Sequence, residues 1–178
     1  MKEADMTIYD FTFVVDADPI DDTFEDRFIE AGCDDATFVL MRGNALLSFD
    51  READSYKDAV LSAYQQIRNS GSEIVRFEPD FLVSQVEIAS RSGLTKQAIG
   101  MFIKGERRAG FPAPNARIES ASPLWDWVEV SHWLLEQGKV SAQVYGDALI
   151  SRIINVGSQV NHLKGDNGFD IEGMLKAA

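Results

Sequence analysis

The sequence predicts an α+β protein made of three segments. Over residues 1–80, runs of β-branched and aromatic residues alternate with runs of helical periodicity, which predicts an α+β domain. Residues 81–138 contain two short helical runs around a glycine, then a further short helix. Residues 139–178 hold a longer helical run and a tail that we expect to be mobile. With 178 residues, 45% of them hydrophobic, the chain can bury one substantial core or two small ones.

A strand and a helix open the first domain. Residues 7–15, TIYDFTFVV, have the β-branched and aromatic composition of a strand. Residues 22–32 predict an amphipathic helix, because Phe24, Phe28 and Ile29 recur at helical spacing and are expected to face inward.

A hairpin, a second helix and a last strand complete this domain. In residues 36–49, ATFVLMRGNALLSF, two apolar runs flank Arg-Gly-Asn, whose glycine and asparagine tolerate positive φ. Residues 72–80 predict the last strand. The resulting order β-α-β-β-α-β is that of a ferredoxin-like domain, a shape shared by many unrelated activities. The second helix spans residues 54–70, and its expected inward residues are Ala59, Val60, Ala63 and Ile67.

The stretch EIASRSGLTKQAIGMFIKG, residues 87–105, predicts two short helices joined by a tight turn. Ser84 and Glu87 have the spacing of a capping box, and Thr95 is placed to cap the second helix. Gly93 supplies the backbone conformation that the turn requires. The residues expected to point to the core are Ile88, Ala89, Leu94, Ile99, Phe102 and Ile103.

Helix pairs of this kind place their second helix, here residues 95–104, in the major groove of DNA. There Gln97 can read adenine and Lys96 can read guanine or a phosphate. Thr95 and the helix N-terminus can hold a phosphate. The candidate DNA-contacting residues are Ser84, Gln85, Thr95, Lys96, Gln97, Gly100, Met101, Lys104, Arg107, Arg108 and Arg117.

The charge distribution supports this assignment. Residues 1–82 carry seven Lys+Arg and nineteen Asp+Glu, a net charge of −12 that equals the net charge of the whole chain. Residues 83–117 carry six basic and two acidic residues, and residues 118–178 carry four and eight. The only net-positive stretch therefore contains the helix pair, as expected if this part of the protein faces a polyanion.

Residues 116–127 predict a small β-hairpin, and residues 128–138 predict a short helix. Residues 141–163 predict a longer helix with an apolar side that a monomer leaves uncovered, and we therefore expect a homodimer with two recognition helices one DNA turn apart. The expected apolar side consists of Val144, Ala148, Ile153, Val156 and Val160.

Residues 84–136 resemble the winged helix-turn-helix domains of the MerR and phage-excisionase type. The shared features are the helix pair with Gly93-Leu94, then Phe111-Pro112, Leu124-Trp125 and Val130-Trp133-Leu134. The resemblance implies sequence-specific binding of duplex DNA, usually as a dimer or in cooperative arrays. Two positions depart from the pattern: Ser92 stands where an apolar residue is usual, and Ser122-Pro123 stands where the wing often carries basic residues.

Other sites are disfavoured by their spacing. Asp16, Asp18, Asp21 and Asp22 lack the glycine and distal glutamate of a calcium loop, and one cysteine with two distant histidines gives no zinc pattern. Cys33 has no histidine near it in sequence and is interpreted as a packed thiol. The three tryptophans are interpreted as core and subunit-contact residues. We therefore expect no metal, no cofactor and no catalytic activity.

The sequence thus predicts a bacterial or phage DNA-binding transcription regulator, a repressor, with double-stranded DNA and a second copy as partners. The alternatives are an antitoxin-like or adaptor protein that acts through protein binding, and an excisionase-type recombination factor. The acidic first domain is either a solvated surface, a site for a protein partner, or a region that repels non-specific DNA. The absence of an export signal or a membrane-spanning run, together with a single cysteine, predicts a cytoplasmic protein.

Overall fold

The computed structural model describes residues 7–16 and 23–167. The protein is α+β and divides into two compact units. Unit 1 consists of residues 1–79 and 153–178, and unit 2 of residues 80–152. The expected segment 139–178 is therefore divided between the two units, because helix α6 (Ala142–Asn167) contributes to both. Within the described ranges, no helix is long and apolar enough to cross a membrane.

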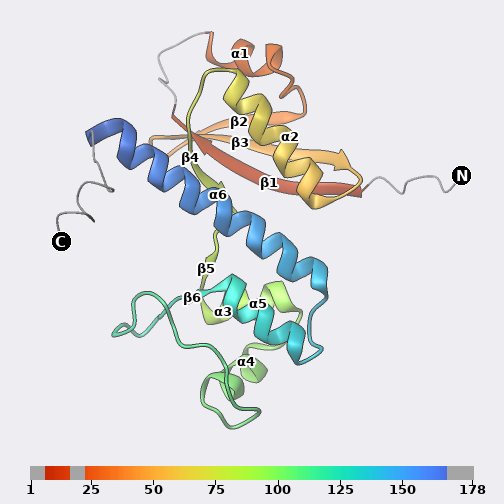
Figure 1. Ribbon diagram of the computed structural model, residues 1–178, viewed down its shortest axis with the longest axis vertical. Coiled ribbons are helices and arrows are strands. Elements are labelled where there is room, and N and C mark those ends of the chain that lie inside the picture. The colour runs from red at the N-terminus through yellow and green to blue at the C-terminus, as the bar shows by residue number, and fades with distance from the viewer. Residues whose placement is uncertain (1–6, 17–22, 168–178) are drawn as a thin grey trace, which may run out of the picture. The chain divides into compact units, whose positions relative to one another are not determined.

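Unit 1 is built on a four-stranded antiparallel sheet with the order β2-β3-β1-β4 (Figure 1). Its elements follow one another as β1 (Thr7–Val15), α1 (Phe24–Glu30), β2 (Ala36–Met41), β3 (Asn44–Ala53), α2 (Tyr56–Asn69) and β4 (Ile74–Glu78). Strands β2 and β3 form the predicted hairpin, because Arg42 and Gly43 both adopt the positive φ that a two-residue turn requires.

Both helices of unit 1 pack on the same face of the sheet. From α1, Phe28 contacts Phe38 of β2, and from α2, Tyr64 contacts Phe13 of β1. The two central strands, β1 and β3, bury alternate residues on this face, as the twofold alternation of a half-buried strand requires. The fully buried side chains include Phe13, Phe28, Leu47, Phe49, Val60, Ile67 and Phe77, so the core of unit 1 is largely aromatic.

The expected inner face of the first helix was wrong at one position. Phe28 is buried, but Ile29 is 50% exposed. Ile29 lies five residues after Phe24, which is about 500° of rotation, or 140° away from it around the helix. Only the spacing of four between Phe24 and Phe28 keeps two side chains on one face.

The outer edge of β4 is covered by one side chain. Asn155 of α6 is 1% exposed; its Oδ1 accepts from the Phe77 N–H at 2.8 Å, and its Nδ2 donates to the Phe77 carbonyl at 2.9 Å. The amide thereby satisfies both edge groups of Phe77 as a neighbouring strand does. These two bonds also fix which side of α6 faces unit 1.

Unit 2 gathers three helices and a short sheet around a second core. Its elements are β5 (Leu82–Val83), α3 (Gln85–Ser92), α4 (Lys96–Ile103), β6 (Trp125–Asp126), α5 (Trp127–Glu136) and the first part of α6. The core joins residues from all of them, including Val83, Ile88, Ile99, Phe102, Trp125, Trp127, Val130, Trp133, Leu134 and Ala148. All three tryptophans are buried in this core.

The apolar side expected for the long helix was wrong. Val144 packs on the core of unit 2 and Ala148 is buried there, whereas Ile153 is 68% exposed. Five residues separate Ala148 from Ile153, which places them about 140° apart around the helix. From Ser151 onward the buried side consists instead of Ser151, Ile154, Asn155 and Ser158.

Candidate nucleic-acid interface

The helix pair, defined here as α3, the turn at 93–95 and α4, is fixed at each end by caps. The Ser84 hydroxyl accepts from the Glu87 N–H, and the Glu87 carboxylate accepts from the Ser84 N–H at 2.7 Å, which completes the capping box. Gly93 ends α3 with a φ of 67°, in the left-handed region. Thr95 caps α4 by accepting from the Ala98 N–H at 3.1 Å.

The core side of the helix pair follows the sequence with one exception. Ile88, Ala89, Ile99 and Phe102 are buried, and Leu94 packs against them. Ile103, expected in the core, is 37% exposed. It is the last residue of α4, where the chain turns away through Lys104, so the expected inward position was wrong.

Ser92 occupies a position of the helix pair at which helix-turn-helix units usually have an apolar residue. Its side chain is half-buried, and its hydroxyl is hydrogen-bonded. Its Oγ donates back to the Ile88 carbonyl at 2.6 Å, one turn earlier in α3. A polar residue is therefore accommodated because the helix backbone supplies its partner.

Six of the candidate residues line one shallow hollow of about 540 Å³ on the outer side of the helix pair. Two residues that were not candidates, Ile103 and Glu106, line it as well. The site thus combines amide, ammonium and apolar groups with one carboxylate. The six candidates are Gln85, Lys96, Gln97, Gly100, Met101 and Lys104.

Gln85 acts as a brace between the two helices. Its Nε2 donates to the Lys96 carbonyl at 2.9 Å, joining α3 to the first turn of α4. A β-carbon at Gly100 would lie 3.1 Å from this Nε2, closer than ordinary packing allows. Gly100 leaves the space that the Gln85 amide occupies, and the Gln85 side chain, bonded to Lys96, does not extend freely from the hollow.

The side chains that do extend from α4 are Lys96 and Gln97, both exposed at its first turn. Lys104 at the other end is exposed and approaches Glu106 at 3.9 Å, a solvated ion pair of little energetic weight. The hydroxyl of Thr95 accepts in its cap and keeps its proton available to donate outward.

The basic residues of this stretch have different roles. Arg91 donates to the Asp80 carbonyl at 2.6 Å and lies over the Trp127 ring, so it stabilises the unit. Arg107 lies over Phe102, and Arg108 donates to Gln137. Arg117, with a φ of 52°, lines a separate open hollow formed by residues 115–120.

The expected β-hairpin at 116–127 was wrong in its extent. Ala116 and Leu124 form a single antiparallel bridge, and the residues between them are turns and bends. Trp125 and Asp126 pair instead with Val83 and Leu82 of β5, about forty residues earlier in the chain. Ser122 and Pro123 lie in the loop that the Ala116–Leu124 bridge closes, and they carry no charge.

Asp126 anchors this part of the unit from within. It is 2% exposed, caps α5 by accepting from the Val128 N–H at 2.8 Å, and pairs with Arg152 at 2.9 Å. Burial raises the pKa of its carboxyl, and the Val128 hydrogen bond and the Arg152 charge act in the opposite direction.

Elsewhere the described residues form no group of three or more His, Cys, Asp or Glu that could hold a metal ion. Asp18, Asp21 and Asp22 lie outside the described residues. Cys33 is buried in unit 1, and burial raises the pKa of its thiol to about 11, which leaves it protonated at neutral pH.

Comparison of the chain with protein-family models, with curated proteins and with solved structures finds no match. Function is therefore inferred from the residues of the site itself.

Proposed function

We propose that the protein is a sequence-specific transcription regulator, a repressor, that binds duplex DNA with α4 in the major groove. The observation that carries the proposal is the hollow on the outer side of the helix pair, where exposed Lys96 and Gln97 stand at the first turn of a capped helix. Residues at this position of a recognition helix reach base edges. The proposal assigns the protein a binding role and no catalytic step.

Each exposed group of α4 has a chemistry suited to DNA. Gln97 presents an amide that can pair with adenine, and Lys96 presents an ammonium for guanine or a phosphate. The Thr95 hydroxyl and the first N–H groups of α4 can hold a phosphate, which fixes the register of the helix. Met101 offers an apolar contact for a thymine methyl.

Arginines outside the hollow would supply contacts that do not depend on sequence. Arg107, Arg108 and Arg117 are all exposed, and each is within fifteen residues of α4 in the chain. The Ser84 N–H donates to Glu87 and the Ser84 hydroxyl oxygen accepts from the Glu87 N–H in the capping box. Ser84 can therefore contact DNA only by donating its hydroxyl proton. Phosphate contacts of this kind provide affinity and salt dependence.

We also propose that unit 1 has a ferredoxin-like fold and that unit 2 is a winged helix-turn-helix domain. The strand order β2-β3-β1-β4 with both helices on one face supports a ferredoxin-like unit 1. In unit 2, the helix pair, the 116–124 bridge and the β5–β6 pairing support a winged helix-turn-helix with a short wing.

A homodimer is also part of the proposal. Ile153, Val156 and Leu163 are exposed on α6, away from the side on which Asn155 is buried. Residues 153–163 contain no Asp, Glu, Lys or Arg, in a chain of which 26% is charged. A second copy can approach this side without like-charge repulsion, and two copies present two recognition helices to an inverted repeat.

A protein-binding adaptor, antitoxin-like in character, is the second candidate function. Strand β2 favours it, because β2 lies at an edge of the sheet and exposes apolar side chains. In this alternative the helix pair is a docking surface and its basic residues are solvated.

A salt titration of duplex binding separates the two functions. We expect the logarithm of the association constant to fall linearly with the logarithm of salt concentration, with a slope of about −0.9 for each phosphate contacted. Fluorescence anisotropy of labelled duplexes measures it. Binding that is absent at low salt, or that does not change with salt, would contradict DNA binding and favour the adaptor.

A further inference from the structure

The two edges of the sheet in unit 1 differ in how they are protected. At the β4 edge, the Asn155 amide bonds both backbone groups of Phe77. At the β2 edge, no strand in residues 7–16 or 23–167 pairs with the outer side of Ala36–Met41. An unpaired strand edge is a template for a further strand unless charge, proline or a covering element blocks it.

The residues of β2 provide no such block. The strand reads ATFVLM, with no charged residue and no proline. Leu40 is 61% exposed and Met41 is 53% exposed. The edge therefore offers both free backbone groups and apolar side chains to an extended segment.

The hairpin turn identifies which backbone groups are free. Because Arg42 and Gly43 form a two-residue turn, Met41 and Asn44 are a hydrogen-bonded pair, and pairing alternates from there. Thr37, Val39 and Met41 thus bond to β3. The N–H and C=O groups of Phe38 and Leu40 point to the open side, whereas the Ala36 N–H already donates to the Cys33 carbonyl at 3.1 Å.

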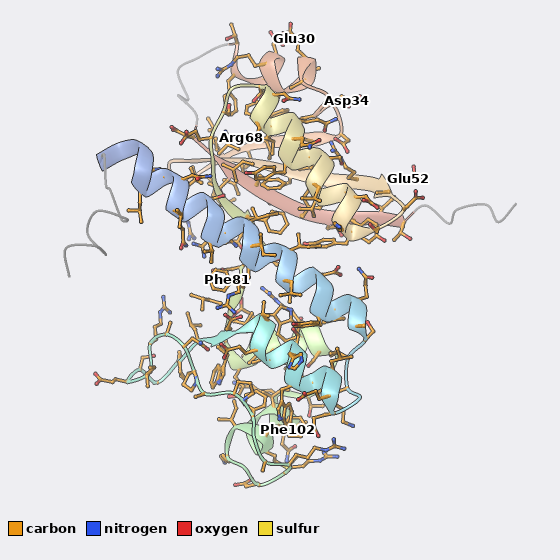
Figure 2. All side chains as sticks on the ribbon, viewed as in Figure 1. Glu30, Asp34, Glu52, Arg68, Phe81 and Phe102 are labelled. Atoms are coloured by element: carbon orange, nitrogen blue, oxygen red, sulfur yellow. The ribbon has the colours of Figure 1, made fainter. Side chains whose placement is uncertain are left out.

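The charge around this edge selects the occupant. Helix α1 packs on β2 through Phe28 and Phe38, and it carries the exposed acidic residues Glu25, Asp26 and Glu30. Asp34 is exposed immediately before β2, and Figure 2 shows Glu30 and Asp34 at the periphery of this unit. Unit 1 holds nine basic and twenty-one acidic residues, a net charge of −12, which at this edge opposes a second copy and favours a cationic segment.

We propose that the β2 edge binds an extended, lysine- or arginine-bearing segment of a partner protein, which adds an antiparallel or parallel strand beside Ala36–Met41. Main-chain hydrogen bonds to Phe38 and Leu40 supply the pairing, and the carboxylates of α1 attract the basic side chains. This inference is independent of DNA binding by the helix pair and concerns a different unit.

The test uses the full chain and a synthetic peptide that alternates valine and lysine. Amide hydrogen exchange of the free protein is expected to be fast at Phe38 and Leu40 and slow at Thr37, Val39 and Met41. Adding the peptide should slow exchange at Phe38 and Leu40 by at least about tenfold, since each of these amides gains a hydrogen bond. The same peptide N-methylated at alternate residues keeps the charge but cannot complete the ladder, and it should give no protection.

A variant pair makes the test specific for the edge. Leu40→Lys adds a positive charge beside the free groups and should weaken peptide binding at least about tenfold. Leu61→Lys, on the exposed side of α2, is the matched control and should leave binding unchanged.

Three results would overturn the proposal. Equal binding of the N-methylated peptide would show general attraction to an acidic surface. Concentration-dependent protection of Phe38 and Leu40 without peptide would assign the edge to a second copy. Concentration-independent protection of the same amides would show that another part of the chain already occupies it.

Discussion

The two units divide the charge of the protein unequally. Unit 1 carries the whole net charge of −12, whereas unit 2 has eight basic and eight acidic residues and is neutral. Within unit 2, six of the eight basic residues fall in residues 83–117, which hold only two acidic residues and are therefore net positive. Helix α4 lies in this stretch and can contact a polyanion that the acidic residues of unit 1 repel.

This difference indicates how a strongly acidic protein can bind DNA selectively. Non-specific affinity comes mainly from phosphate electrostatics, which the carboxylates of unit 1 oppose. In the proposed complex, contacts from Gln97 and Lys96 to base edges would then supply a larger share of the remaining affinity.

Among the changes to DNA binding, reversing charge on α4 should have the largest effect. Lys96→Glu combined with Lys104→Glu places two carboxylates in the hollow, and we expect duplex affinity to fall at least about a hundredfold. Fluorescence anisotropy at fixed salt measures the loss. Lys57→Glu, an exposed reversal on α2 of unit 1, is the control and should change affinity little.

Removing the Asn155 amide should destabilise unit 1. Asn155→Leu leaves the buried N–H and C=O of Phe77 without partners, at a cost of about 1–3 kcal/mol for each group. Urea unfolding, followed by a signal from unit 1, measures the free energy of unfolding. Asn161→Leu, at an exposed position of the same helix, should cost far less, and equal losses would contradict the role of Asn155.

Gln97→Ala should change sequence preference more than general affinity. Loss of its amide contact should reduce discrimination at one base pair by about 1–3 kcal/mol, while affinity for unrelated duplexes stays nearly constant. Competition among duplexes that differ at single positions measures the discrimination. Equal weakening of binding to all duplexes would show that Gln97 does not contact a base edge.

Arg107→Ala should reduce general affinity and leave sequence preference unchanged. If Arg107 contacts a phosphate, its loss weakens binding to all duplexes alike and reduces the salt slope by about one. Arg91→Ala is the informative comparison, because Arg91 is bound to Asp80 and Trp127 and should alter stability with no change in the slope.

The smallest effect concerns an acidic pair in unit 1. Asp10 and Asp50 face each other across β1 and β3, and a hydrogen bond from Asp10, with its charge, raises the pKa of the Asp50 carboxyl above the ordinary 3.8. A raised pKa favours the folded state at low pH, and this contribution is lost as pH rises through the folded pKa. Asp50→Asn should therefore raise the melting temperature at neutral pH and not below the ordinary pKa, as calorimetry across pH can show.

The local features of the fold could be predicted from sequence. The β1 run, the Arg-Gly-Asn turn and the caps at Ser84 and Thr95 are each determined by neighbouring residues. The hollow was partly predictable for the same reason, since the spacing on α4 brings its outer residues together.

Features that depend on distant residues could not be predicted. The partner of Trp125-Asp126 is β5, about forty residues away, and nothing in the run ARIESASPLWDW specifies it. The brace from Gln85 to the Lys96 carbonyl required the crossing of α3 and α4. On α6, the apolar residues do not form one side, because Ala148 and Ile153 face different ways. The buried contact there is Asn155, a polar residue that periodicity of apolar residues cannot identify.

Selection from a pool of randomised DNA duplexes tests the central claim most directly. The account predicts that the wild-type protein enriches one motif at physiological salt, arranged as an inverted repeat with half-sites about one helical turn apart. It also predicts that Gln97→Ala loses the preference at one position of each half-site. No enrichment by the wild-type protein, or the same motif from the Lys96→Glu, Lys104→Glu variant, would contradict it.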